Sequence, residues 1–367
     1  MSFHLRRRTT PLLVMLSTTF AAVALSGSFP GPEPLRHATS NQLGMNTFVP
    51  YNCESIPSWS STATTQIQAF KSLGANAVAL AFPLYTDSLN SNSFYAKDVC
   101  NTQYQTPTPE ELATIVDIAH AQGLQVFLRP LLYEANLQAE KPGAWRGIID
   151  PTNTSLWFKN YWATMLPYLQ MAQSNRVEHF AISTELQSMA SKPNWATLIA
   201  KARRVYTGDL VFTTNWAPRE NDGVYWAGTS VGLDLYSGVT GLSDNATPTQ
   251  IVAGWNDELA TTNRFPLIST ATISETGILP QDGAYARPYS WTLPLTTDPF
   301  NQEIQANWFT AACLFFKSHD MGGIYFWGSA IYEQGGALLT GPSTNVETYS
   351  EIQPLSQRAI RACFTGR

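Results

Sequence analysis

The chain has 367 residues, a length that suits one large catalytic domain and buries a sizeable core. Charged residues make up 13% of it, well below the usual share of about 25%, as expected of an exported protein with many Ser, Thr, Asn and Gln side chains. The formal net charge is −5, and removing the three arginines at 6–8 from the 22 basic residues leaves 19 against 27 acidic ones. This balance excludes nucleic-acid binding through a basic surface as the main function of the protein.

The N-terminus has the pattern of an export signal. Three arginines at 6–8 precede an apolar stretch at 11–25, which is too short to span a bilayer comfortably. We predict a signal peptide at 1–26, a linker at 27–40 and a catalytic domain at 41–367, in a protein that is secreted or held in the cell envelope. An uncleaved membrane anchor is the alternative. If the signal is cleaved, we expect no stable membrane insertion.

Strand-like and helix-like segments then alternate along the chain. Apolar runs bounded by turn residues predict strands at 42–48, 75–82, 124–130, 176–185, 210–216, 231–236, 267–275 and 322–328. Helical segments are expected at 62–74, 108–122, 156–174, 194–206, 248–262, 302–319 and 351–364. Thr108 is a natural N-cap and Gly123 a natural stop for the second helix, whereas Pro83 is expected to end the second strand.

Nearly continuous apolar strands that alternate with helices are typical of a parallel sheet covered on both faces. We therefore predict an α/β fold with a single (β/α)8 TIM barrel. Its long polar segments, 84–107 and 277–299, are expected to form extended loops at the C-terminal face, where catalytic groups of such barrels lie.

The four cysteines are even in number, which fits an oxidising compartment. Three pairings are possible. We favour Cys53 with Cys100, in loops after the first two strands, and Cys313 with Cys363, joining the last two helices. No cysteines have CxxC spacing and no two of the five histidines have ligand spacing, so we predict no metal site and no cofactor.

Two glutamates close predicted strands. Glu185 ends the fourth strand and Glu275 the seventh, so both should open on the same face of a barrel. Two carboxyls that face each other across one cleft are the equipment for hydrolysing a glycosidic bond with retention. Repulsion between them is expected to raise the pKa of Glu185 and keep it protonated near neutrality. For either glutamate alone, a surface salt bridge is the alternative interpretation.

Five segments carry a resemblance to a known family. The segments are 109–130, 155–186, 195–216, 273–277 and 301–328. In their order and spacing they resemble Glycoside Hydrolase Family 113, a retaining β-mannanase family. This family belongs to a clan of barrels with catalytic glutamates on strands 4 and 7. The resemblance implies an acid/base at Glu185, a nucleophile at Glu275 and β-1,4-mannan or a manno-oligosaccharide as substrate. It also implies that Tyr236 hydrogen-bonds the nucleophile and that Trp327 lies under the sugar in the cleaved subsite.

One position departs from the clan pattern. Many members place Asn before the strand-4 glutamate, where it binds the sugar 2-hydroxyl, but this chain has Thr184, which leaves the identity of the sugar open. Further candidates for substrate binding are Asn215, Trp216 and Arg129 at strand ends and Trp145 and Trp291 in long loops. A barrel that hydrolyses another β-glycan, such as a glucan, and a barrel that only binds glycan are the alternatives. We expect a monomer whose partner is its polysaccharide substrate.

Overall fold

The computed structural model describes residues 41–51, 56–98, 104–216, 227–262, 268, 271–290, 300–330 and 352–366. All of them belong to one compact unit, Arg36–Arg367. The predicted signal peptide and linker lie outside the described residues, and so do Cys53, Cys100 and Trp291. Within the described ranges, no helix combines the length and the apolar character needed to cross a bilayer.

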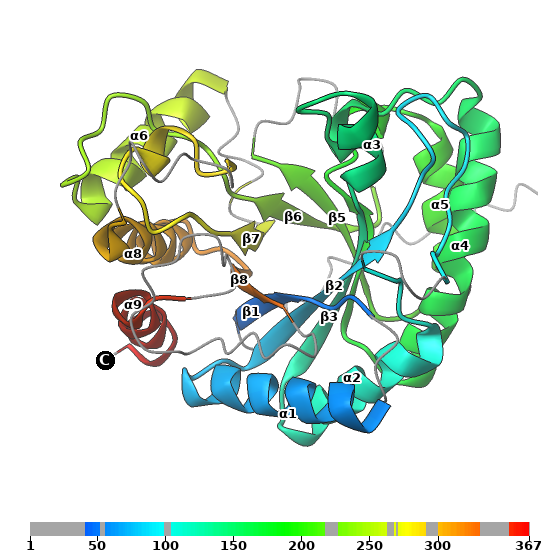
Figure 1. Cartoon of the computed structure of the whole chain (residues 1–367), viewed down its shortest axis with the longest axis horizontal. Helices are drawn as coiled ribbons and strands as arrows, with labels where there is room; N and C mark the ends of the chain where they lie inside the picture. Colours follow the sequence, from blue (N-terminus) through cyan, green and yellow to red (C-terminus); the bar gives the residue numbers. More distant parts are fainter. Residues whose placement is uncertain are drawn as a thin grey trace, which may run out of the picture. The chain divides into compact units, whose positions relative to one another are not determined.

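Parallel strands close into an eight-membered barrel in chain order, with the last strand paired to the first (Figure 1). The strands are β1 Gln42–Phe48, β2 Ala77–Leu84, β3 Gln125–Leu132, β4 His179–Thr184, β5 Asp209–Asn215, β6 Ser230–Asp234, β7 Ala271–Thr276 and β8 Gly323–Ala330. The register at closure sets Asn46 beside Trp327. The predicted (β/α)8 barrel is confirmed.

Helices lie outside the strands (Figure 1). They are α1 Ile56–Ser72, α2 Pro109–Ala121, α3 Ala135–Glu140, α4 Thr154–Ser174, α5 Asn194–Ala202, α6 Pro248–Thr262, α8 Gln302–Ser318 and α9 Pro354–Thr365. Three short 3-10 turns are η1 Arg146–Ile148, η2 Gln187–Met189 and η3 Ala284–Ala286. The α3–η1 segment, which follows β3, supplies part of the site described below.

Local sequence signals account for several helix ends. Thr108 caps α2 as predicted: its hydroxyl accepts a hydrogen bond from the Glu111 backbone at 3.2 Å, and the Glu111 carboxylate accepts one from the Thr108 backbone at 2.7 Å. Gly123 follows the end of α2 with a φ of +70°, a left-handed conformation that glycine adopts freely. Asn153 caps α4 through its side-chain oxygen, which accepts a hydrogen bond from the Leu156 backbone at 3.0 Å.

The core has an inner and an outer part. A small cluster from alternate strand positions fills the barrel; it comprises Ala77, Ala79, Phe127, Ala181, Val211 and Tyr325. The Tyr325 ring lies so close to Gly44 that a β-carbon there would come within 2.2 Å of it, so this position has no room for a side chain. A larger apolar cluster packs the strands against the helices. Because strand side chains alternate, Arg129 points to the same side as Phe127, towards the barrel axis.

Two predicted boundaries are wrong for physical reasons. Pro83 does not end the second strand, because β2 continues to Leu84. The pairing of β1 with β2 ends at Ala81, so the missing N–H of Pro83 removes no hydrogen bond to β1. The Pro83 carbonyl accepts a hydrogen bond from the Thr106 hydroxyl instead, at 2.7 Å. Helix α1 begins at Ile56, six residues earlier than expected, and uses Pro57 in its first turn, where proline is tolerated.

The predicted bridge between the last two helices is confirmed. Cys313 on α8 and Cys363 on α9 form a disulfide with a Cα–Cα distance of 5.7 Å and a sequence separation of 50. The other predicted bridge, Cys53–Cys100, lies outside the described residues and stays a prediction.

Replacing Cys313 and Cys363 together by serine is expected to lower the free energy of unfolding by roughly 2–4 kcal/mol, because the bridge restricts a long loop in the unfolded chain. Urea unfolding of the double variant beside the wild-type protein measures the difference. An unchanged urea midpoint would show that α9 is held by packing alone.

Candidate active site

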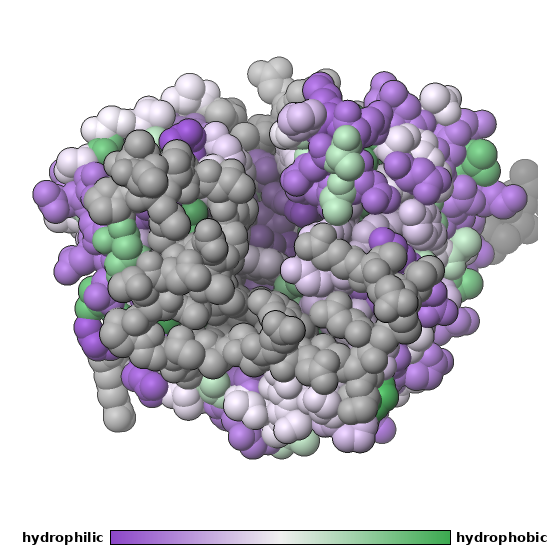
Figure 2. Space-filling model, viewed as in Figure 1, coloured by the Kyte–Doolittle hydropathy of each residue, from purple (hydrophilic) through white to green (hydrophobic). Residues whose placement is uncertain are grey.

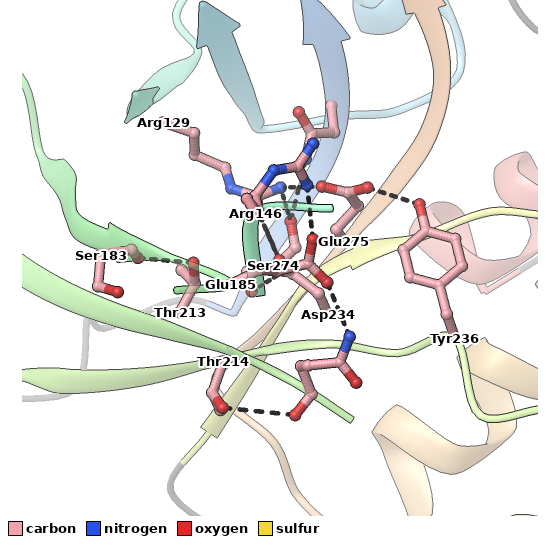
Figure 3. A network of polar contacts seen from close by, with 12 residues as sticks. Arg129, Arg146, Ser183, Glu185, Thr213, Thr214, Asp234, Tyr236, Ser274 and Glu275 are labelled. Atoms are coloured by element: carbon pink, nitrogen blue, oxygen red, sulfur yellow. Dashed lines mark hydrogen bonds and ion pairs between the residues drawn. The ribbon is translucent and has the colours of Figure 1, made fainter. Parts of the chain in front are cut away.

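Every strand of the barrel runs in the same direction, so the ends of β4 and β7 open on one face. Glu185 follows the last residue of β4, and Glu275 is the penultimate residue of β7. Figure 3 shows both side chains in one polar network with Arg129, Arg146, Asp234 and Tyr236. In the view of Figure 1, the space-filling surface has a hollow between α6 and α3 whose coloured walls are mostly hydrophilic (Figure 2).

Glu275 receives two strong donors. The Tyr236 hydroxyl donates to its Oε1 at 2.6 Å, and Nη1 of Arg129 donates to its Oε2 at 2.7 Å. Burial, and after it the charge of Glu275, raises the pKa of Tyr236 well above its usual value, so the phenol keeps its proton and remains a donor. The contact from Tyr236 is the one that the family resemblance implies.

Arg129 is fully buried and held from three sides. Its Nη2 donates to both oxygens of Asp234, at 2.9 and 2.7 Å, and its Nη1 also donates to the Ser274 carbonyl at 3.0 Å. Burial alone would lower the pKa of Arg129, but Asp234 and Glu275 outweigh burial and raise it. Burial also raises the pKa of Asp234, and the guanidinium of Arg129 opposes that rise. The arginine is therefore a fixed positive charge beneath Glu275.

Glu185 has a different environment. Its backbone is left-handed, with a φ of +52°, and its side chain is almost completely buried. Nη1 of Arg146 donates to Oε2 at 2.7 Å, and Nδ2 of Asn215 donates to Oε1 at 3.1 Å. Burial raises the pKa of Glu185, Arg146 lowers it, and Glu275 raises it again. The direction matches the prediction, but its main cause is loss of solvent rather than repulsion between the two glutamates.

Arg146 comes from the turn η1, in the loop between β3 and α4. Its Nε donates to the Leu132 carbonyl at 2.9 Å, its Nη2 lies 3.2 Å from Oε1 of Glu134, and its backbone N–H donates to the same oxygen at 3.1 Å. The Trp145 ring packs over Gly147, where a β-carbon would come within 2.1 Å of it. The loop is thus pinned at three consecutive residues, and it directs a guanidinium at Glu185.

Trp216 and Trp327, both predicted to bind substrate, have different surroundings. Trp216 stacks on the exposed ring of Tyr289, with centroids 5.5 Å apart, and meets Tyr236 edge-on at 6.4 Å, so it lies beside the network. Trp327 packs against a small apolar cluster that comprises Phe48, Ala81 and Leu131.

Thr184 is the last residue of β4. It is 2% exposed, and its hydroxyl has no hydrogen-bond partner among the described residues. Trp145 is partly exposed beside Arg146. The substrate contacts proposed for these residues stay predictions.

Comparison with known proteins agrees with the barrel fold. The sequence profile of Glycoside Hydrolase Family 113 matches residues 53–337, most of the chain. The chain belongs to this family. It is therefore a glycoside hydrolase, an enzyme that acts on O-glycosidic bonds.

Solved structures share the fold of this family member at low sequence identity. A family 113 β-1,4-mannanase superposes with a TM-score of 0.67 at 17% identity, covering 89% of this chain and 100% of its own. A family 113 β-mannanase from Alicyclobacillus acidocaldarius gives 0.64 at 19%, covering 89% and 98%. A β-glucuronidase from Faecalibacterium prausnitzii gives 0.52 at 12%, covering 89% of this chain and 49% of its own. No curated protein sequence matches the chain significantly.

Three charged residues of this family 113 site escape sequence reasoning: Glu134, Arg146 and Asp234. Asp234 has a detectable signal, since a carboxylate inside the apolar run 231–236 shares its strand face with Tyr236 two residues later. Glu134 lies two residues beyond the end of β3, and a position just after a strand is a weak signal for a site residue. Arg146 has no such signal, because it reaches Glu185 from a loop whose path no periodicity predicts.

Proposed function

We propose that the protein is a secreted, retaining glycoside hydrolase that cleaves β-1,4-linked mannan or manno-oligosaccharides. The observation that carries the proposal is that the two carboxyls have different surroundings. Glu275 is contacted by a buried arginine and a phenol, which suits a carboxylate that attacks as an anion. Burial raises the pKa of Glu185, which suits an acid that must hold a proton.

In the proposed reaction Glu275 attacks the anomeric carbon while Glu185 protonates the departing glycosidic oxygen. A covalent glycosyl-enzyme forms, with the anomeric carbon bonded to a Glu275 oxygen. Glu185, now ionised, then takes a proton from water, which displaces Glu275 and releases the sugar with retained configuration. Tyr236 and Arg129 hold the Glu275 carboxylate in place before the attack and receive it again when it leaves.

Mannan is supported by family membership and by the β-mannanases among the structural neighbours. Thr184 favours keeping a second candidate, another β-glycan. Its hydroxyl side chain is shorter than the asparagine of the clan pattern and reaches less far towards a sugar 2-hydroxyl, and mannose and glucose differ at that hydroxyl. Export is supported by the Cys313–Cys363 bridge, since disulfides persist in oxidising compartments.

The purified protein is expected to hydrolyse manno-oligosaccharides faster than oligosaccharides of cellulose, xylan or mixed-linkage glucan. Proton NMR of the first product should show the β-anomer before mutarotation, because two successive displacements at the anomeric carbon restore its configuration. An α-anomer appearing first would instead indicate inversion. Saturable glycan binding with no hydrolysis of any of these substrates would favour a binding protein, and preferential cleavage of glucan would assign the second candidate.

A further inference from the structure

Each of the two glutamates is paired with its own arginine, and each arginine also holds a second carboxylate. Arg129 joins Glu275 to Asp234, and Arg146 joins Glu185 to Glu134. The two units differ in burial. The side chains of Arg129 and Asp234 are 1% and 0% exposed, whereas those of Arg146 and Glu134 are 14% and 21% exposed. The unit at Glu275 is enclosed, and the unit at Glu185 lies near the surface on a loop.

The difference suits the chemistry of the two glutamates. In a double displacement the nucleophile attacks as a carboxylate anion and is released as one, whereas the acid/base carboxyl changes its charge in each half of the cycle. A lone guanidinium 2.7 Å from Glu185 would favour the ionised form throughout. When Glu185 is protonated, the charge of that guanidinium would have no anion to balance it. Glu134 supplies the missing countercharge through its contacts with the Arg146 guanidinium and backbone.

We propose that Arg146 and Glu134 act as a pair of positioning residues on Glu185, Arg146 stabilising its carboxylate and Glu134 restraining Arg146 so that the protonated acid can also form. This inference rests on the proposed acid/base role of Glu185. Neither residue touches the reacting atoms in the proposal; both act through the charge of Glu185.

Within the described part of the chain, the charged groups that act on Glu185 are consistent with this assignment. Burial comes first and raises its pKa; Arg146 lowers it, Glu275 and Glu134 raise it, and Arg129 lowers it. Asn215 contributes a neutral amide donor on the other oxygen. Arg146 and Glu134 are the two of these charges that belong neither to the other catalytic carboxyl nor to the buried unit beneath it. They can therefore be changed separately from the nucleophile.

The test is the pH dependence of kcat/KM on an unactivated oligosaccharide, whose departure needs the proton of Glu185. The alkaline limb then reports loss of that proton in the free enzyme. Removing a positive charge destabilises the ionised form, so Arg146→Met should move the limb to higher pH by about 1 to 3 units. Removing a negative charge does the opposite, so Glu134→Gln should move it to lower pH. Arg146→Lys should restore the limb towards its wild-type position.

Lys141→Met is the matched control, because it removes an exposed positive charge from the same loop, and its limb should stay in place. Shifts in the same direction for Arg146→Met and Glu134→Gln, or no shift in either, would overturn the inference. Should Arg146→Met not fold, Arg146→Lys and Glu134→Gln still decide the result. Full activity in Glu185→Ala would instead refute the acid/base role, so the two failures are distinguishable.

Discussion

Glu275→Ala is expected to abolish turnover on every substrate, with a loss of more than about 10⁴-fold, because no other group replaces a nucleophile. Glu185→Ala removes only the proton donor and base. Its loss should be about 10² to 10⁴-fold on oligosaccharides with poor leaving groups and much smaller for formation of the intermediate from an aryl mannoside, whose phenolate departs unprotonated. Release of the intermediate should then be slow, because no base activates water.

Azide distinguishes the two roles. With Glu185→Ala and the aryl mannoside, added azide should accelerate turnover and give a β-glycosyl azide, because azide attacks the glycosyl-enzyme without a base. Glu110→Ala, which removes an exposed glutamate from the first turn of α2, should behave as wild type in all assays. If Glu275→Ala gives the β-azide and Glu185→Ala gives none, the two roles are reversed. Wild-type turnover in both variants would exclude catalysis by either residue.

Arg129→Met is expected to lower the free energy of unfolding by about 3 to 5 kcal/mol, because it leaves the buried Asp234 without the cation that binds both its oxygens. Activity should fall as well, since Glu275 loses the contact that orients it. Urea unfolding measures the first effect, and kcat at saturating substrate measures the second.

A second substitution separates loss of charge balance from loss of packing. Arg129→Met combined with Asp234→Asn removes the unpaired negative charge, so the double variant should recover part of the stability but none of the activity. Arg204→Met, at an exposed arginine, should change stability by less than about 0.5 kcal/mol. A double variant no more stable than Arg129→Met would show that the lost side-chain packing, and not the charge of Asp234, carries the effect.

The strand and helix pattern was predictable because it depends on short-range signals. Continuous apolar runs mark strands buried on both faces, Thr108 with Glu111 marks a capped helix, and two glutamates at strand ends place the candidate site. The errors come from contacts that no local pattern encodes. Pro83 stays in β2 because the neighbouring strand has already ended, a fact about β1 rather than about Pro83.

The site itself was predictable only where its residues follow strands. Glu275, Arg129 and Asn215 lie in strands, Tyr236 lies two residues beyond the end of β6, and all four take part in the network. Arg146 lies 14 residues beyond Leu132, whose carbonyl it binds, and its approach to Glu185 depends on how the intervening loop folds. The cause of the raised pKa of Glu185 also required the structure, because burial cannot be judged from two glutamates in a sequence.

The left-handed backbone at Glu185 bears on the stability of the fold around the candidate site. A residue with a side chain held at a φ of +52° costs roughly 1–3 kcal/mol relative to a relaxed backbone, whereas glycine adopts that angle without steric penalty. Burial of a carboxyl adds to the cost. Glu185→Gly would relieve that angle, but it would leave the Arg146 guanidinium and the Asn215 amide without the carboxylate that accepts a hydrogen bond from each. The fold therefore accepts a local loss of stability at the position that carries the proposed acid/base carboxyl.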